Sequence, residues 1–209
     1  MKIAIIAAMD KEVKLLKTLE SANVSVFKSG IGKVAAAVAA AQIISEYHPD
    51  LIINSGVAGG LDDSLNIGDT VCAEIVCYHD VWCGEPNAYG QVQGFPLFYK
   101  SDTNITALID AKIKKGLIIS GDKFITAPEE LAMLKNKFPE ALAVDMESAA
   151  IAQTAFMLNT PFVSLRLISD TPGAQHHQEQ YDNFWRNAAE TSFENLQTLL
   201  NKIMQLNAN

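Results

Sequence analysis

Positive charge is scarce in this sequence. Only two of its 209 residues are arginine, Arg166 and Arg186, and the formal net charge is −8. A surface that binds nucleic acid needs clustered lysine and arginine, so we expect no nucleic-acid partner. The acidic residues are spread along the chain rather than gathered in a tail, which also argues against an acidic interaction segment.

Long apolar runs and paired cysteines are lacking as well. No stretch approaches the ~20 apolar residues of a membrane-spanning helix, and the apolar start of the chain meets charged residues at 10–12 before it could form a signal sequence. Cys72, Cys77 and Cys83 show neither Cys-x-x-Cys spacing nor the histidine partners of a zinc site. We therefore expect a cytoplasmic protein with reduced thiols, no bound metal and no membrane partner.

The sequence does contain a regular alternation of short apolar runs and segments of helical period. Such alternation is typical of βα units around a mostly parallel sheet that is buried on both faces. We therefore predict an α/β fold in a single domain over residues 1–209. The expected strands are 3–8, 23–28, 51–54, 70–78, 116–120, 142–146 and 162–169, and the expected helices are 12–19, 34–47, 128–137, 147–157 and one from about 181 almost to the end.

Two glycine-containing segments follow expected strands. Residues 30–33 lack the third glycine of a dinucleotide fingerprint and the spacing of a P-loop, so they do not predict a nucleotide cofactor. Residues 55–60 carry little side chain and are predicted as a tight loop, which either brings the backbone close to a ligand or is only a turn. Residues 80–94 form a long loop, and loops of this length are usually functional or mobile.

Acidic side chains lie at or just after the ends of three of the expected strands. They are Asp10 and Glu12, Asp145 and Glu147, and Asp170. Ligands of α/β sheets bind beyond the carboxyl ends of the strands, so these carboxylates are expected to meet at one rim. Cleavage of a glycosidic bond uses such groups as acid, base and hydroxyl binder.

Each candidate also has an ordinary explanation. Glu12 can be an anion favoured by the dipole of its helix, Glu147 can be a helix cap, and Asp170 can be a turn residue before a Thr-Pro-Gly sequence. The histidines have no metal-binding spacing, and we favour solvent-facing or structural roles for them. They are His79, His176 and His177.

Six segments taken together carry a family resemblance. They are 9–16 (MDKEVKLL), 28–36 (KSGIGKVAA), 52–61 (IINSGVAGGL), 120–125 (SGDKFI), 143–150 (AVDMESAA) and 166–170 (RLISD). In this order they resemble the bacterial 5′-methylthioadenosine/S-adenosylhomocysteine nucleosidases of the nucleoside phosphorylase superfamily. The resemblance implies a three-layer α/β fold with a central mixed, mostly parallel sheet. It also implies a hydrolase without a cofactor, which splits the N-glycosidic bond of either nucleoside into adenine and a 5-thioribose product.

The resemblance further implies a role for individual residues. Glu12 would activate the attacking water, Asp170 would protonate the adenine, and Glu147 would hold the ribose hydroxyls. Phe124 would stack on the purine, and Tyr181, where the family usually has Phe, would cover the 5′ end. The complete set of implied substrate-binding residues is Met9, Ile31, Ala58, Gly59, Phe124, Ile125, Asp145, Met146, Glu147, Arg166, Ser169 and Tyr181.

The chain departs from the family pattern in several places. The stretch before Ser29 is shorter than usual, so we expect a hairpin of the sheet to be missing. Val57 replaces a common Ser, and Asp145 replaces a common Glu. The middle of the loop 79–93 differs too, and in the family this loop contributes to the 5′ pocket of the partner in a homodimer.

Other functions remain open at this point. Hydrolysis is preferred to phosphorolysis, because a phosphate nucleophile needs dedicated cationic side chains and the chain has two arginines in all. The alternatives are a related purine nucleosidase or nucleoside phosphorylase with a different 5′-substituent preference, and a noncatalytic nucleoside-binding protein.

Overall fold

A computed structural model describes residues 1–174, 176–187 and 193–206. The strands are β1 (Ile3–Ala7), β2 (Val24–Lys28), β3 (Leu51–Gly60), β4 (Thr70–Tyr78), β5 (Tyr99–Lys100), β6 (Lys114–Ser120), β7 (Ala141–Asp145) and β8 (Phe162–Asp170). The helices are α1 (Asp10–Leu16), α2 (Lys33–Tyr47), α3 (Thr103–Leu108), α4 (Pro128–Lys137), α5 (Ser148–Met157), α6 (His177–Asn187) and α7 (Glu194–Leu206). No helix within these ranges is both long and apolar enough to cross a membrane.

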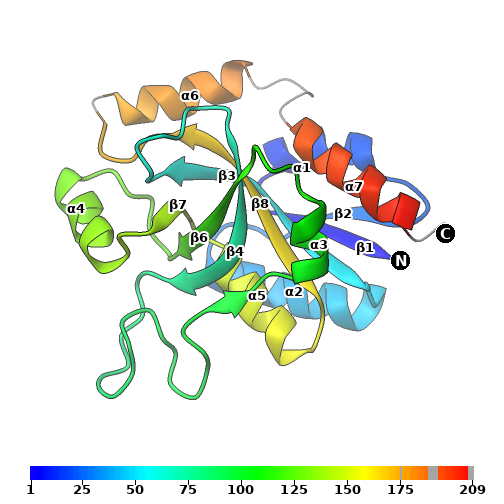
Figure 1. The fold of residues 1–209 in the computed structure, drawn as a ribbon, viewed down its shortest axis with the longest axis horizontal. Helices are drawn as coiled ribbons and strands as arrows, with labels where there is room; N and C mark the ends of the chain where they lie inside the picture. Colours follow the sequence, from blue (N-terminus) through cyan, green and yellow to red (C-terminus); the bar gives the residue numbers. More distant parts are fainter. Residues whose placement is uncertain (175, 188–192, 207–209) are drawn as a thin grey trace.

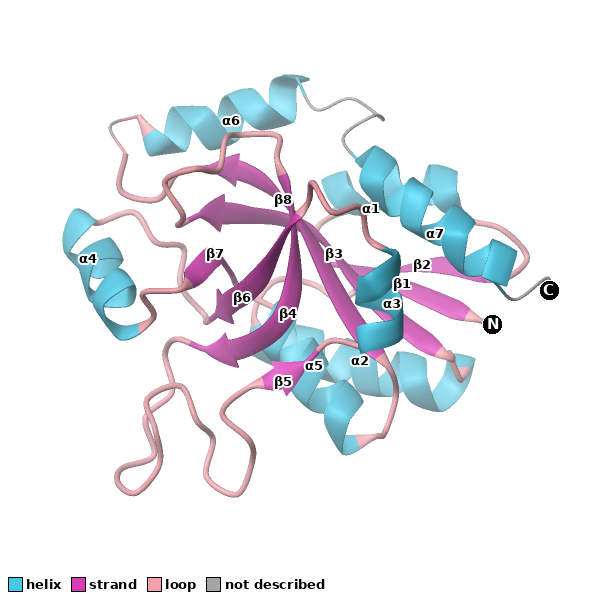
Figure 2. Ribbon diagram, in the orientation of Figure 1, coloured by secondary structure: helices cyan, strands magenta, loops and turns pink. Residues whose placement is uncertain are grey.

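The helices cover the sheet on both sides (Figures 1 and 2). Alternate side chains of β1 point to opposite faces, which is why a strand buried on both faces is apolar throughout. Ala4 and Ile6 join a buried cluster with residues of α2 and α5. Ile3 and Ile5 join a second cluster with residues of α1, α3 and α7. The molecule therefore has three layers.

The sheet is mixed. Within the described ranges it has eight strands in the order β2-β1-β3-β7-β6-β4-β5, and β8 pairs with both β3 and β4. Five pairs are parallel, β1 with β2 and β3, β3 with β8, and β6 with β4 and β7, and three are antiparallel, β3 with β7 and β4 with β5 and β8. The predicted α/β fold with a mixed, mostly parallel sheet is confirmed.

The loop predicted at residues 55–60 is wrong, because β3 continues through this segment to Gly60. It pairs with β8 from Ile52 to Gly59 and with β7 at its last two residues. The small residues serve packing instead. A Cβ atom on Gly56 would lie 2.5 Å from both Glu12 Oε1 and Arg166 Nη1. The glycine therefore leaves room for two buried charged side chains beside the strand.

The single C-terminal helix predicted from about 181 is also wrong. The described part of this region forms two helices, α6 and α7, and the predicted segment 188–192 lies outside the described residues. The expected apolar stripe is present on α7, where Leu196, Leu199, Leu200 and Ile203 are buried. α6 is more polar and lies across the carboxyl ends of β3 and β8 (Figure 1).

Candidate active site

A cavity of about 340 Å³ lies at the carboxyl ends of the strands. It is lined by Ala8, Met9, Glu12, Ile31, Val57, Ala58, Gly59, Lys123, Phe124, Ile125, Val144, Asp145, Met146, Glu147, Ser169, Asp170, Pro172, Gln178 and Tyr181. The three carboxylates singled out from the sequence, Glu12, Glu147 and Asp170, are among them. Segments that are distant in sequence thus meet around one space, as expected from their positions after strand ends.

Glu12 projects from the first turn of α1 and is 1% exposed. Its Oε2 accepts hydrogen bonds from the backbone N–H groups of Ala8 at 3.0 Å and Met9 at 2.9 Å, and its Oε1 accepts one from Val57 at 2.9 Å. Burial nevertheless raises the pKa of Glu12, although Arg166 and these hydrogen bonds oppose the rise. The backbone therefore fixes both oxygens of a carboxylate that has an increased affinity for a proton.

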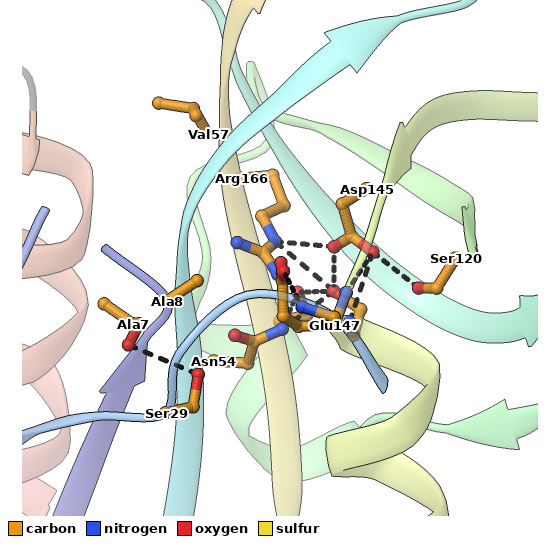
Figure 3. A network of polar contacts seen from close by, with 12 residues as sticks. Ala7, Ala8, Ser29, Asn54, Val57, Ser120, Asp145, Glu147 and Arg166 are labelled. Atoms are coloured by element: carbon orange, nitrogen blue, oxygen red, sulfur yellow. Dashed lines mark hydrogen bonds and ion pairs between the residues drawn. The ribbon is translucent and has the colours of Figure 1, made fainter. Parts of the chain in front are cut away.

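Arg166 does not line the cavity, although it was expected to bind substrate. Its side chain is buried behind the lining, with Nε 2.7 Å from Asp145 Oδ2 and Nη2 3.5 Å from Glu147 Oε2 (Figure 3). Burial alone lowers the pKa of Arg166, but Asp145, Glu147 and Glu12 more than offset this and raise it. The guanidinium is thus a permanent positive charge that neutralises part of the carboxylate cluster.

Asp145 lines the cavity, but its carboxylate is occupied by the protein. Oδ1 accepts hydrogen bonds from Ser120 Oγ at 2.5 Å and from the backbone N–H of Ser148 at 3.1 Å, and Oδ2 contacts Arg166 and the Ser148 hydroxyl (Figure 3). Two of these donors belong to the start of α5. The residue therefore caps this helix and holds the guanidinium, and we assign it a supporting role rather than the predicted contact with substrate.

Glu147 immediately precedes α5 and is 5% exposed. Its Oε1 accepts a hydrogen bond of 3.0 Å from the backbone N–H of Gly32, at the start of α2. Burial raises the pKa of Glu147 to about 7, while Arg166 opposes the rise. The carboxyl group therefore changes its charge near neutral pH.

Asp170 is the last residue of β8 and is 1% exposed. Oδ1 accepts a hydrogen bond of 2.6 Å from Ser169 Oγ, and Oδ2 lies 2.9 Å from Nε2 of His177. Burial raises the pKa of Asp170, whereas Ser169 and His177 lower it. A carboxyl group with an increased affinity for a proton has a property that a general acid needs.

Aromatic and apolar side chains form the rest of the wall. Phe124 and Tyr181 make an edge-to-face contact with ring centroids 5.5 Å apart, and the Tyr181 hydroxyl lies 3.5 Å from Met9 Sδ. Met146, Ile31 and the backbone of Ala58 and Gly59 complete this part of the lining. Such a surface suits a flat heterocycle and an apolar substituent better than a highly charged ligand.

Eleven of the twelve residues expected to bind substrate line the cavity, and Arg166 is the exception. Further lining residues were missed: Ala8, Lys123, Val144, Pro172 and Gln178. The first four lie within two positions of a predicted site residue, so their place in the sequence could have indicated them. Gln178 carried no such signal. His176 is exposed, in line with the sequence prediction, whereas His177 is buried against Asp170.

Known proteins resemble the chain over nearly its whole length. The model of the phosphorylase superfamily matches residues 2–201. A 5′-methylthioadenosine/S-adenosylhomocysteine nucleosidase from Anoxybacillus flavithermus is 38% identical, with 97% of this chain and 99% of that protein covered. The aligned region spans 231 residues, more than the 209 of this chain, so the relative has segments without a counterpart here.

Solved structures give the same result. The nucleosidase of Neisseria meningitidis in complex with methylthio-immucillin-A matches with a TM-score of 0.89 and 35% identity, covering 95% of this chain and 98% of that one. The nucleosidase of Colwellia psychrerythraea in complex with adenine matches with a TM-score of 0.88 and 35% identity, covering 96% and 95%. The chain therefore belongs to the phosphorylase superfamily and, within it, to the 5′-methylthioadenosine/S-adenosylhomocysteine nucleosidases.

Proposed function

We propose that this chain hydrolyses the N-glycosidic bond of 5′-methylthioadenosine, S-adenosylhomocysteine or both, releasing adenine and a 5-thioribose product without a cofactor. The observation that carries the proposal is the meeting of three buried carboxylates, Glu12, Glu147 and Asp170, around one cavity with an aromatic wall. Relatives of this name bind adenine or an adenine-nucleoside analogue, which supports the same class of ligand here.

Asp170 is the proposed acid. Departure of adenine places negative charge on the base, and a proton delivered to the ring nitrogen turns the base into a neutral leaving group. The buried carboxyl holds its proton because burial raises its pKa, and Ser169 fixes the orientation of Oδ1. Phe124 would stack on the purine, and the backbone of Ile125 would read its edge.

Glu12 is the proposed base. The ribose becomes cationic and oxocarbenium-like as adenine leaves, and a carboxylate stabilises this charge while it takes a proton from the attacking water. The raised pKa of Glu12 favours the second step. Val57 offers no hydroxyl to the water, so the carboxylate carries more of its positioning here than in relatives with Ser.

Water rather than phosphate is the proposed nucleophile. Lys123 is the cationic side chain of the described cavity lining, and Arg166 is occupied by carboxylates behind it. We expect the rate of adenine release from methylthioadenosine to be the same with and without inorganic phosphate. Chromatography of the sugar product tests this. A ribose 1-phosphate formed only with phosphate would identify a phosphorylase, and tight binding without turnover would identify a nucleoside-binding protein.

Glu147 is proposed to accept hydrogen bonds from the ribose hydroxyls, which requires its ionised form. Because its pKa is about 7, we expect the KM of the wild-type protein to rise as the pH falls through 7. Glu147→Gln should raise KM about 10- to 100-fold, because it removes a hydrogen bond to a charged group. It should also abolish the pH dependence of KM. Steady-state kinetics from about pH 5.5 to about pH 8.5, a range that brackets this pKa, provide the measurement. The exposed Glu129→Gln is the control, and an unchanged pH dependence in Glu147→Gln would assign the titration elsewhere.

A homodimer is the proposed assembly. Exposed apolar side chains lie on the adjacent helices α2 and α5, namely Val34, Val38, Phe156 and Met157, and Trp82 is exposed in the loop 79–93. Ile31 is exposed as well and lines the cavity, so the apolar surface reaches the edge of the site. This continuity supports a second copy that packs on α2 and α5 and brings its loop 79–93 close to the 5′ end of the substrate.

Val38→Asp is expected to convert the dimer into a monomer, because it places a charge in a desolvated apolar contact. Light scattering coupled to size-exclusion chromatography measures the mass. Met133→Asp is the matched control, since Met133 is an exposed apolar residue on α4. A dimer that survives Val38→Asp, with the control unchanged, would place the interface on another surface.

We further propose that residues 1–209 form one nucleosidase domain that acts in the cytoplasm. The thiols of Cys72, Cys77 and Cys83 are all free, as is usual for proteins of a reducing compartment.

A further inference from the structure

The buried pair of His177 and Asp170 is not explained by the roles assigned so far. His177 lies at the start of α6 and is 5% exposed, and its Nε2 is 2.9 Å from Asp170 Oδ2. The contact is close but poorly aligned, because neither atom makes a hydrogen bond of good geometry. The other oxygen of Asp170 is occupied by the Ser169 hydroxyl. Both oxygens of the proposed acid therefore have a protein neighbour.

A second contact holds the imidazole ring in place. The rings of His177 and Phe124 have centroids 5.0 Å apart and an interplanar angle of 32°. Phe124 lines the cavity, whereas His177 is absent from the described lining. The histidine thus lies behind the acid and the aromatic wall and can affect the substrate only through them.

Burial helps Asp170 to hold its proton, but it does not help Asp170 to release the proton. It favours the neutral carboxyl and disfavours the carboxylate that proton transfer leaves behind, whereas an efficient general acid has a pKa near the working pH. An imidazolium within ion-pair distance acts in the opposite direction by stabilising the carboxylate that remains after proton transfer. In its protonated form His177 supplies this charge, because its Nε2 lies 2.9 Å from Oδ2 of Asp170.

We propose that His177 is a positioning residue that orients Oδ2 of Asp170 and makes its proton transferable to the leaving base. This inference rests on the proposed nucleosidase function. It assigns His177 no contact with substrate. The proton donated to adenine comes from the Asp170 O–H bond, and the resulting carboxylate is stabilised by the imidazolium and by the Ser169 hydroxyl until it regains a proton.

The other charged or titratable groups near the pair are unchanged when His177 is replaced. Glu12, Glu147, Lys123 and Tyr181 share the cavity with Asp170, and Arg166 lies behind the carboxylates. Just before α6, His176 forms an exposed pair with Glu179 of that helix, and Asp182 of α6 is exposed. A change seen on substitution of His177 therefore reports on His177 rather than on these groups.

Two variants separate the contributions of the ring. His177→Phe keeps a ring against Phe124 but removes the nitrogen, and we expect kcat to fall about tenfold with little change in KM. Without the imidazolium, the pKa of Asp170 rises, so the alkaline limb of the kcat profile should move up by about 1 pH unit or more. His177→Gln keeps a hydrogen-bond donor near Oδ2 but carries no charge. Its kcat should therefore lie between those of His177→Phe and the wild type, while the alkaline limb of its kcat profile stays displaced.

Controls and a second readout make the outcomes distinct. His176→Gln should leave the profile unchanged, and thermal unfolding should show that all variants are folded. If the alkaline limb stays at its wild-type position in both His177 variants, the proposal is overturned, whether or not kcat falls. Titration of the Asp170 carboxyl by ¹³C NMR, assigned with Asp170→Asn, tests the pairing without turnover. Absence of adenine release by the wild-type protein would instead overturn the proposed function.

Discussion

Asp170→Asn is expected to lower kcat for adenine release by about 10²- to 10⁴-fold, the usual contribution of a general acid. Asparagine has nearly the size and shape of aspartate but carries no transferable proton. Its amide oxygen can still accept the hydrogen bond that Ser169 Oγ donates to Oδ1. The substitution therefore removes the proton and preserves the contact with Ser169.

The expected loss is in kcat rather than KM, because proton transfer stabilises the transition state and not the bound substrate. Ultraviolet detection of adenine release at several substrate concentrations separates the two constants. Asp63→Asn makes the same chemical change at an exposed carboxylate paired with Lys135, and it should be indistinguishable from wild type. Full activity of Asp170→Asn would show that Asp170 is not the acid that protonates adenine.

Most of the fold follows from the apolar pattern of the sequence. Strand β1 is buried on both faces, so it is an uninterrupted apolar run that local analysis can find, and β8 begins with apolar residues as well. The error at residues 55–60 has a different origin. Glycine ordinarily marks a turn, but Gly56 lies within a long strand because Glu12 and Arg166 pass close to it. That requirement comes from segments far apart in the chain and leaves no local pattern.

The site was predictable in its carboxylates but not in its supporting contacts. Position after a strand end brought Glu12, Glu147 and Asp170 together, which is a consequence of parallel topology. The burial of Arg166 behind Asp145 depends on the register of β8 against β3 and on the start of α5. The resemblance implied that both residues belong to the substrate-binding set, with Arg166 helping to position water and carboxylates. In the structure Arg166 forms ion pairs with Asp145 and Glu147.

His177 was missed for a related reason. α6 is a polar helix whose position on the molecule is decided by tertiary packing, and its sequence does not reveal which residue faces Asp170. The two consecutive histidines at the start of this region, His176 and His177, look alike in the sequence. In the structure His176 is exposed beside Glu179, and His177 is buried beside the proposed acid. Only the three-dimensional arrangement distinguishes them.

Glu12→Gln is expected to lower kcat by about 10²- to 10⁴-fold, because an amide cannot take a proton from the attacking water. Unlike Asp170→Asn, this change also disturbs the fold. Three backbone N–H groups donate to the two oxygens of Glu12, and glutamine can offer an acceptor on one side only. Its NH₂ group must face a donor, so we expect a loss of about 1–3 kcal/mol in the free energy of unfolding.

Comparison with a surface carboxylate separates the two effects. Asp10→Asn lies on the same helix, where Asp10 forms an exposed ion pair with Lys28, and it should change neither kcat nor stability appreciably. Urea unfolding measures the stability of each variant, and kcat is measured at temperatures where Glu12→Gln remains folded. If kcat falls only in proportion to the folded fraction, Glu12 is a structural anchor and another group activates water. A loss that persists in the folded protein assigns the proton transfer to the Glu12 carboxylate, which the three backbone donors hold in place.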